Sequence, residues 1–173
     1  MKEFGTIRLT KGEVLATDPC YDKGTWCTVP IKNVRAGNYK AYVEETDQGS
    51  WGIRNARLYL VHEDYNPEEL NFVEIPGSDA GVDAGVCGFF EDKPNYDDDA
   101  WDKLCDNEFE ENDRMFGIAS VDNNFKCVGC WSESGYGDGG YPVFTAEDRS
   151  GYVVGMMVEY ISDEEDEDEE DEE

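Results

Sequence analysis

The sequence predicts a mainly β fold, a single antiparallel sandwich or open barrel with one or two short helices. Two observations lead to this fold class. Apolar and polar residues alternate along most of the chain, and Gly, Asn, Asp and Pro separate the alternating segments, as they do between strands. Aromatic residues make up 13% of the chain, and their large rings can bury enough apolar area to form a core.

Ten segments carry the alternating pattern and are expected to form strands. They are residues 6–9, 13–17, 28–34, 39–45, 52–62, 84–90, 115–121, 125–130, 141–146 and 152–161. The pattern is clearest in the fifth segment, where Ala56, Leu58 and Leu60 would line one apolar face. Residues 147–151 separate the last two strands and predict a hairpin loop.

One segment, over about residues 98–107, has the pattern of a helix. Three carboxylates at positions 97–99 stand where negative charge favours a helix N-terminus, and Trp101, Leu104 and Cys105 follow at helical spacing. Residues 63–70 are expected to hold one further helical turn. The chain therefore predicts strands as its main elements, with helix only in these two places.

The chain is expected to form one β-rich domain over residues 1–161, followed by a disordered acidic tail over residues 162–173. The last eleven residues are all Asp or Glu, and no apolar group among them could offset the cost of ordering. Such a tail could tether a basic partner or collect cations. It could equally serve only to keep the protein in solution.

The charge of the chain limits its partners. It carries 42 acidic against 14 basic residues, a formal net charge of −28. This balance argues against direct binding to nucleic acid or to an anionic bilayer, because both require clustered Lys and Arg. No apolar run approaches the roughly 20 residues of a membrane span, and the N-terminus lacks the apolar segment of a signal peptide. These features predict a cytoplasmic protein with no membrane partner, stabilised by salt.

The six cysteines are expected to be mainly buried, reduced thiols. Cys127 and Cys130 have the C-x-x-C spacing of zinc and redox motifs, so those two alternatives stay open. The spacing is not repeated elsewhere, since Cys20 and Cys27 lie seven positions apart. In an alternating segment, Cys127 and Cys130 would also point to opposite faces of a strand.

Three segments combine Gly, Asp and aromatic residues in a way that a core does not require. The first is residues 17–21 followed by 24–27, with Asp18, Tyr21 and Trp26. The second is residues 80–90, with Asp83 and three glycines, and the third is residues 134–142, with four glycines around Asp138. Glycines allow the backbone to approach a ligand or a neighbouring strand closely. Glycine-rich loops can also form anion-binding nests or orient an Asp toward a cation.

These segments contain, in order, the motifs Asp18-Pro19-Cys20-Tyr21, Gly-Val-Asp-Ala-Gly at 81–85 and Ser-Gly-Tyr-Gly-Asp-Gly-Gly-Tyr at 134–141. With these motifs, the chain resembles an uncharacterised family of bacterial and phage proteins, a domain of unknown function. The resemblance covers residues 13–161, and the segment at 134–141 is its most specific part. It implies an intracellular β-rich domain. It supplies no activity and no catalytic residue, and the acidic tail is an addition to the family pattern.

These segments supply the candidate binding residues. They are Asp18, Tyr21, Trp26, Asp83, Tyr136, Asp138 and Tyr141. Asp18, Asp83 and Asp138 are also candidate ligands of a divalent cation, calcium or magnesium, because such cations prefer oxygen ligands. No segment matches an EF-hand loop, so the alternative is that these aspartates organise turns.

The sequence identifies no catalytic residue. His62 is the one histidine and could act as a general base, but the alternation places it on the face of Leu58 and Leu60, which favours a structural role. Ser134 lacks the pattern of a nucleophile elbow. The glycines of 135–140 match G-x-G-x-x-G, yet a strand follows them and not the helix that a dinucleotide site needs.

Two functions are consistent with these features. The first is a non-enzymatic acidic protein that binds a basic protein partner, with a phage-type inhibitor or a DNA mimic as one form of it. The second is a divalent-cation-dependent hydrolase or small-ligand-binding protein that uses Asp18, Asp83 and Asp138, with His62 as a further candidate. The second function requires these side chains to converge in space.

Overall fold

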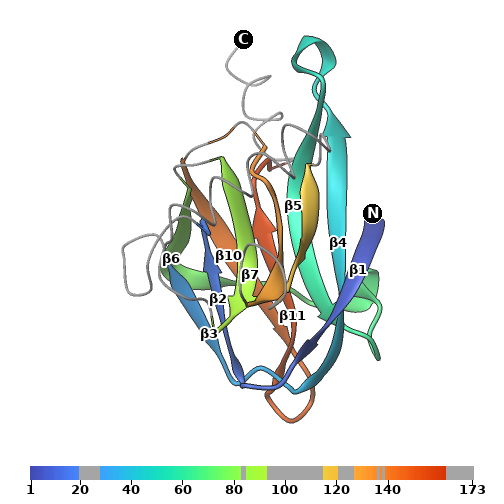
Figure 1. Cartoon of the computed structure of the whole chain (residues 1–173), viewed down its shortest axis with the longest axis vertical. Helices are drawn as coiled ribbons and strands as arrows, with labels where there is room; N and C mark the ends of the chain where they lie inside the picture. Colours follow the sequence, from blue (N-terminus) through green and yellow to red (C-terminus); the bar gives the residue numbers. More distant parts are fainter. Residues whose placement is uncertain are drawn as a thin grey trace.

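The computed structural model describes residues 1–19, 28–82, 85–92, 115–120, 127–135, 137 and 139–162. Two antiparallel sheets pack face to face, and the chain crosses between them several times (Figure 1). The fold is therefore the β-rich sandwich that the alternating pattern predicts. Two 3₁₀ turns, η1 (Gly49–Trp51) and η2 (Pro67–Glu69), are its helical elements within the described part of the chain.

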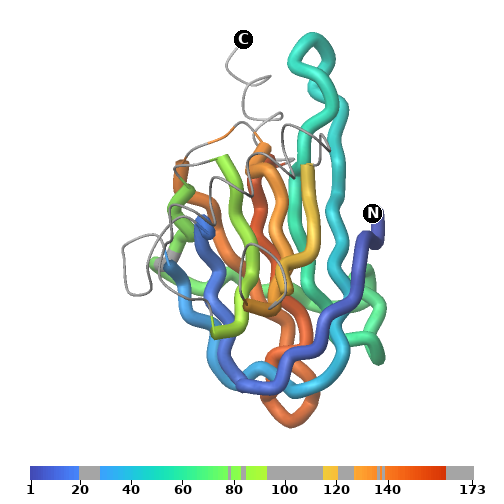
Figure 2. Tube along the Cα trace, viewed as in Figure 1, coloured from blue at the N-terminus to red at the C-terminus, as the bar shows by residue number. Residues whose placement is uncertain are grey.

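The first sheet has six strands. In spatial order they are β1 (Lys2–Leu9), β4 (Gly37–Asp47), β5 (Ile53–His62), β11 (Val153–Glu159), β10 (Gly139–Glu147) and β6 (Val73–Val82). All neighbours are antiparallel. The turns of the β4–β5 and β10–β11 hairpins lie at opposite ends of this sheet, and Figure 2 shows the β4–β5 turn extending beyond the rest of the sandwich.

The second sheet has five strands. In spatial order they are β3 (Val29–Lys32), β2 (Glu13–Thr17), β7 (Val86–Glu91), β9 (Val128–Glu133) and β8 (Phe116–Ala119). The edge strands β1 and β8 of the two sheets lie close together, and the rings of Phe4 and Phe116 on them are 4.7 Å apart. In the connection between β1 and β2, the backbone N–H groups of Thr10 and Lys11 donate to the carboxylate of Glu91, the last residue of β7.

The main core lies between the sheets. It contains Leu58 and Leu60 of the predicted apolar face, together with Met156, Phe89 and Cys130. Both leucines are fully buried, as the pattern of β5 requires. Burial of these apolar side chains is the largest favourable contribution to folding.

The three cysteines that the structure describes divide between two layers. Cys87 and Cys130 belong to the main core, whereas Cys127 belongs to a second cluster with Phe90 and Trp131. All three are buried and reduced, and Cys127 and Cys130 lie in different layers. Burial raises the pKa of the Cys130 thiol to about 12, so this thiol is protonated and unreactive near neutral pH.

The second cluster depends on glycines that face aromatic rings. Trp131 pairs across the sheet with Gly117 on one side and Gly88 on the other, and Phe90 pairs with Gly129. A Cβ atom added at Gly117 would lie 2.7 Å from the indole ring, and one at Gly129 would lie 2.2 Å from the carbonyl oxygen of Phe89. The rings therefore occupy space that only glycine leaves open.

A third cluster covers the outer face of the six-stranded sheet. Tyr59, Val61 and Met157 are buried there, and Leu70 and Phe72 of the β5–β6 connection pack against them. The predicted turn in residues 63–70 is confirmed as η2. The N–H of Glu68 in this turn donates to the side chain of Asn66, which caps it. The connection therefore lies over the sheet as a short cover.

Strand β6 was not expected from the sequence. Its alternation is interrupted by Pro76 and Gly77, and its pairing with β10 shifts register between Pro142 and Phe144. The irregular strand is tolerated because β6 is at the edge of its sheet, where a proline breaks no inner ladder. Strand β1 begins four residues earlier than expected, and β9 begins three residues later. The helix over 98–107 lies outside the described residues and stays a prediction.

Candidate binding surfaces at the two ends of the sandwich

The first glycine-rich segment begins at the end of β2, inside the protein. Asp18 is fully buried there, and the hydroxyl of Thr17 donates to its backbone carbonyl. Burial raises the pKa of the Cys87 thiol above its usual range, and the negative charge of Asp18 adds to this effect. Asp18 therefore contributes to the interior at this end of the sandwich and is not a surface contact.

The loop after β9 is closed by its own hydrogen bonds. The hydroxyl of Tyr141 donates to the carbonyl oxygens of Gly137 at 2.7 Å and of Ser134 at 3.3 Å, and the hydroxyl of Ser134 donates to Gly137 at 2.6 Å. The N–H of Gly137 donates back to Ser134. Tyr141, a candidate binding residue, is thus half-buried and holds the loop in shape.

The second and third segments meet around Tyr160. Its ring stands edge-on to Tyr141 with the centroids 5.3 Å apart, and its hydroxyl lies 2.9 Å from Ser132 Oγ and 3.5 Å from the carbonyl oxygen of Cys87. The N–H of Ser134 donates to Gly85 of the second segment. The first segment adjoins this network where Thr17 of β2 pairs with Gly88 of β7.

The remaining candidate residues are Tyr21, Trp26, Asp83, Tyr136 and Asp138, and all five lie outside the described residues. Their described neighbours Val82 and Gly139 are paired across β6 and β10. Within the described ranges, no three His, Cys, Asp or Glu side chains lie close enough together to hold a metal ion. The cation site of Asp18, Asp83 and Asp138 stays a prediction.

Of the glycines in the second segment, Gly88 has a clear structural role. A Cβ atom there would lie 2.1 Å from the carbonyl oxygen of Cys130 on the neighbouring strand β9. The close approach that this glycine permits is therefore to a strand and not to a ligand.

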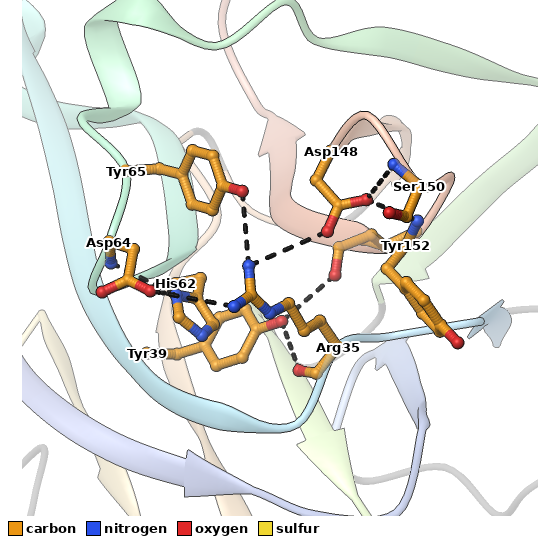
Figure 3. Close-up of polar contacts among 9 residues, drawn as sticks. Arg35, Tyr39, His62, Asp64, Tyr65, Asp148, Ser150 and Tyr152 are labelled. Carbon is orange, nitrogen blue, oxygen red and sulfur yellow. Dashed lines mark hydrogen bonds and ion pairs between the residues drawn. The ribbon is translucent and has the colours of Figure 1, made fainter.

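At the opposite end of the sandwich, Arg35 connects three loops (Figure 3). Its guanidinium donates to the hydroxyl of Tyr65 at 3.3 Å and lies 3.8 Å from Asp148 and 3.9 Å from Asp64. Around it is a hollow of about 750 Å³, also lined by Arg149, Ser150 and Tyr152 among others.

The backbone around this hollow is held by hydrogen bonds to the side chains of Asp148 and Tyr39. Asp148 Oδ1 accepts the N–H groups of Ser150 and Tyr152 at 2.9 and 3.0 Å. The hydroxyl of Tyr39 donates to the carbonyl oxygens of Arg35 at 2.7 Å and Val153 at 3.1 Å. Burial raises the pKa of Tyr39 above its usual range, although the Arg35 guanidinium partly opposes this.

His62 is buried between tyrosines at this end. Its ring stands edge-on to Tyr39 and Tyr65, with centroids 5.3 and 5.9 Å away (Figure 3). Nδ1 accepts the N–H of Asp64 at 3.2 Å, so the neutral ring carries its proton on Nε2. A Cβ atom at Gly37 would lie 2.5 Å from Nε2, which leaves no room for a substrate on that side. The structural role expected for His62 is supported by this packing.

A second hollow, of about 490 Å³, also has Tyr65 in its wall and is acidic. Tyr42 and Met1 line it together with three carboxylates from the β5–β6 connection, Glu63, Asp64 and Glu68. The Asp64 carboxylate also lies 3.9 Å from the guanidinium of Arg35. Burial raises the pKa of Tyr42 above its usual range, with Glu3 adding to the effect, so its phenol is neutral. Neutral aromatic rings beside carboxylates suit a Lys or Arg side chain.

Neither hollow was predicted from the sequence. Arg35, Tyr65 and Asp148 are separated by 30 or more positions along the chain, and no short motif contains two of them. The acidic run at residues 63–69 was visible, but its meeting with Tyr42 depends on how β4 and β5 pair. No sequence signal short of the strand register could have placed these groups together.

The turn of the β4–β5 hairpin is a third exposed feature. Trp51 is 68% exposed and Ile53 is 51% exposed, and both lie at the tip that extends from the sandwich (Figure 1). Glu45 and Asp47, which precede them, are also exposed. The tip combines apolar contact area with nearby negative charge.

Comparison of the chain with family models, with curated proteins and with solved structures found no match. The resemblance to an uncharacterised bacterial and phage family therefore stays a prediction. In the part of the chain that the structure describes, no helix has the length and apolar character needed to cross a membrane.

Proposed function

We propose that this protein is a non-enzymatic binding protein whose acidic surface engages a basic protein partner. The observation that carries this proposal is the acidic hollow beside Tyr65, in which three carboxylates and two tyrosines face the same space. A cationic side chain placed there would meet opposite charge and the faces or edges of two aromatic rings. The net charge of −28 supports the proposal, because it would accelerate the approach of a basic protein.

An inhibitor that imitates nucleic acid is one form of this function. It would occupy the basic groove of a nucleic-acid-binding protein, using carboxylates in place of phosphates. Glu63, Asp64 and Glu68 supply a local group of negative charges for such a contact. The partner is in either case defined by clustered Lys and Arg.

The proposal is tested by measuring how the full chain binds a fluorescent oligo-arginine peptide at low salt. One variant, Glu63→Gln with Glu68→Gln, removes two charges from the hollow. The matched control, Glu13→Gln with Glu74→Gln, removes two exposed charges from other strands. The acidic residues at 163–173 attract the peptide equally in all three proteins, so they do not affect the comparison.

We expect the hollow variant to weaken binding about tenfold and the control variant less than threefold, since only the former removes a contact as well as long-range attraction. Equal losses of affinity in the two variants would show that diffuse charge alone attracts the peptide. The hollow would then no longer support the proposed function. Absence of binding at low salt would overturn the proposal. Circular dichroism of each variant verifies that it is folded.

A further inference from the structure

The tip of the β4–β5 hairpin exposes a large aromatic side chain that the fold does not use for its core. Trp51 is the most exposed of the large apolar residues in the described chain, and Ile53 follows two positions later. Burying an indole ring in a partner removes about 150–250 Å² from water, and tryptophan is among the residues that contribute most to protein interfaces. Exposed apolar groups at a projecting tip therefore indicate a contact surface.

The backbone of this tip is fixed before any partner binds. The N–H of Gln48 donates to Gly52 at 2.9 Å, the N–H of Gly52 donates to Gly49 at 3.0 Å, and Asp47 accepts the N–H of Gly49 at 2.9 Å. Gly49 and Gly52 have φ angles of 64° and 83°, which favour glycine. A turn held in this way loses little backbone entropy on binding.

Charge around the tip identifies the kind of partner. Glu45 and Asp47 are exposed beside it, and Glu45 lies 3.9 Å from Nζ of Lys2 in an exposed ion pair. The guanidinium of Arg54 is directed to the carbonyl oxygens of Trp51 and Gly135. Asp47 therefore places negative charge beside the apolar side chains, in a chain whose net charge is −28. A complementary surface has an apolar pocket with Lys or Arg at its rim.

We infer that the β4–β5 tip, through Trp51 and Ile53, is the anchor that docks into an apolar pocket rimmed by basic residues on the protein partner. This inference rests on the proposed function and adds a second contact to it. The acidic hollow lies near the end of β5 and the tip at its start, so the two contacts are separated by the length of that strand. Charge at the hollow would set the rate of association, and burial of the tip would set the lifetime of the complex.

The test uses two immobilised peptides of equal positive charge. One is an amphipathic helix of Leu and Lys, and in the other Ser replaces every Leu. Binding of the full chain is compared with that of a tip variant, Trp51→Ser with Ile53→Thr, and of the hollow variant, Glu63→Gln with Glu68→Gln. Val73→Thr is the matched control, because Val73 is 59% exposed on β6, away from the tip.

We expect the unchanged protein to bind the Leu–Lys peptide about tenfold more tightly than the Ser–Lys peptide, mainly through slower dissociation. The tip variant should lose this preference and keep the weaker, salt-dependent binding to both peptides. The hollow variant and Val73→Thr should keep the preference.

Three results would overturn the inference. If the tip variant keeps its preference for the Leu–Lys peptide, the tip is not the anchor, although the proposed function stands. If neither peptide binds at low salt, the proposed function fails as well. If the unchanged protein forms dimers that the tip variant cannot form, the tip binds a second copy of the chain and not a basic partner.

Discussion

The β4–β5 and β10–β11 turns close two hairpins of the same sheet at its opposite ends, and both use an aspartate in the same way. Asp47 accepts the N–H of the residue two positions later, and so does Asp148. The surroundings differ. Asp148 is 11% exposed and faces Arg35, whereas Asp47 is exposed on a tip that extends away from the sandwich. Equivalent local chemistry therefore produces an anchored turn in one place and a presented turn in the other.

This difference teaches that the role of a turn is decided by what packs behind it. The β10–β11 turn is tied to Arg35, which also contacts Tyr65, so the turn stabilises the fold. The β4–β5 turn is stabilised mainly by its own backbone, and its apolar side chains face solvent. Substitutions in the anchored turn should affect stability, and substitutions in the presented turn should affect binding.

The largest expected effect is that of Asp148→Ala. It removes the carboxylate that accepts two backbone N–H groups and faces Arg35, and the loss of two hydrogen bonds to a charged group should lower the free energy of unfolding by about 2–3 kcal/mol. Asp47→Ala removes one exposed hydrogen bond and should cost about 0.5 kcal/mol. Urea unfolding of both variants measures the difference, and equal losses would show that the two turns are equivalent.

Tyr39→Phe should have the next largest effect, about 1–2 kcal/mol, because it removes the hydroxyl that donates to the carbonyl oxygens of Arg35 and Val153. The Val153 oxygen keeps the backbone N–H of Arg35 as a donor, so most of the loss should come from the Arg35 oxygen. The measurement is again urea unfolding, at neutral pH. A loss below about 0.5 kcal/mol would mean that water replaces the hydroxyl, and the anchored end would then be more open than its burial indicates.

The raised pKa of Tyr39 also predicts that the stability of the fold decreases at alkaline pH. Its pKa in the folded protein is raised above the ordinary value of 10.0 by burial, so the folded state holds this proton more tightly than the unfolded state. The stabilisation from Tyr39 is therefore fully present below pH 10 and is lost as pH rises above 10. Unfolding measured from neutral pH to about pH 11 should show a steeper loss for the unchanged protein than for Tyr39→Phe. Identical slopes would contradict this assignment.

Arg35→Gln should have a smaller effect, about 0.5 kcal/mol. Its side chain is 41% exposed and its two carboxylate contacts are 3.8 and 3.9 Å long, which is typical of weak surface ion pairs. The loss should shrink in high salt, because salt screens such pairs. A large, salt-independent loss would identify Arg35 as a buried structural group instead.

The smallest expected effect on stability is that of the tip variant, Trp51→Ser with Ile53→Thr. Both side chains are more than half exposed, so the free energy of unfolding should change by less than about 0.5 kcal/mol. Thermal melts give this value. A loss of 2 kcal/mol or more would show that the tip stabilises the fold, and the comparison between the two turns would no longer hold.

Much of the fold could be predicted from the sequence because alternation reports directly on burial in strands. Leu58 and Leu60 of β5 are buried as their period-two spacing predicts. Strand β6 could not be predicted, because Pro76 and Gly77 interrupt its pattern and only its place at the sheet edge makes them acceptable.

The candidate sites were less predictable. The glycine-rich segments did indicate an unusual region, since Asp18 and Tyr141 both belong to the buried network around Tyr160 and Cys87. That network is structural in its described part. Arg35, Tyr65 and Asp148 carry no local signal, because their proximity depends on the order of strands in the sheet. Exposure of Trp51 likewise depends on how far its hairpin extends.

In the five-stranded sheet, glycines are paired with aromatic residues on neighbouring strands, and this pairing limits which substitutions the sequence can accept. The three atoms nearest to a Cβ atom at Gly117 all belong to the side chain of Trp131, whereas the atom nearest to one at Gly88 is the backbone oxygen of Cys130. A smaller residue at 131 could therefore permit a larger one at 117, so these two positions can exchange volume across the strands. Gly88 has no such compensating partner, and descendants of this chain should retain it.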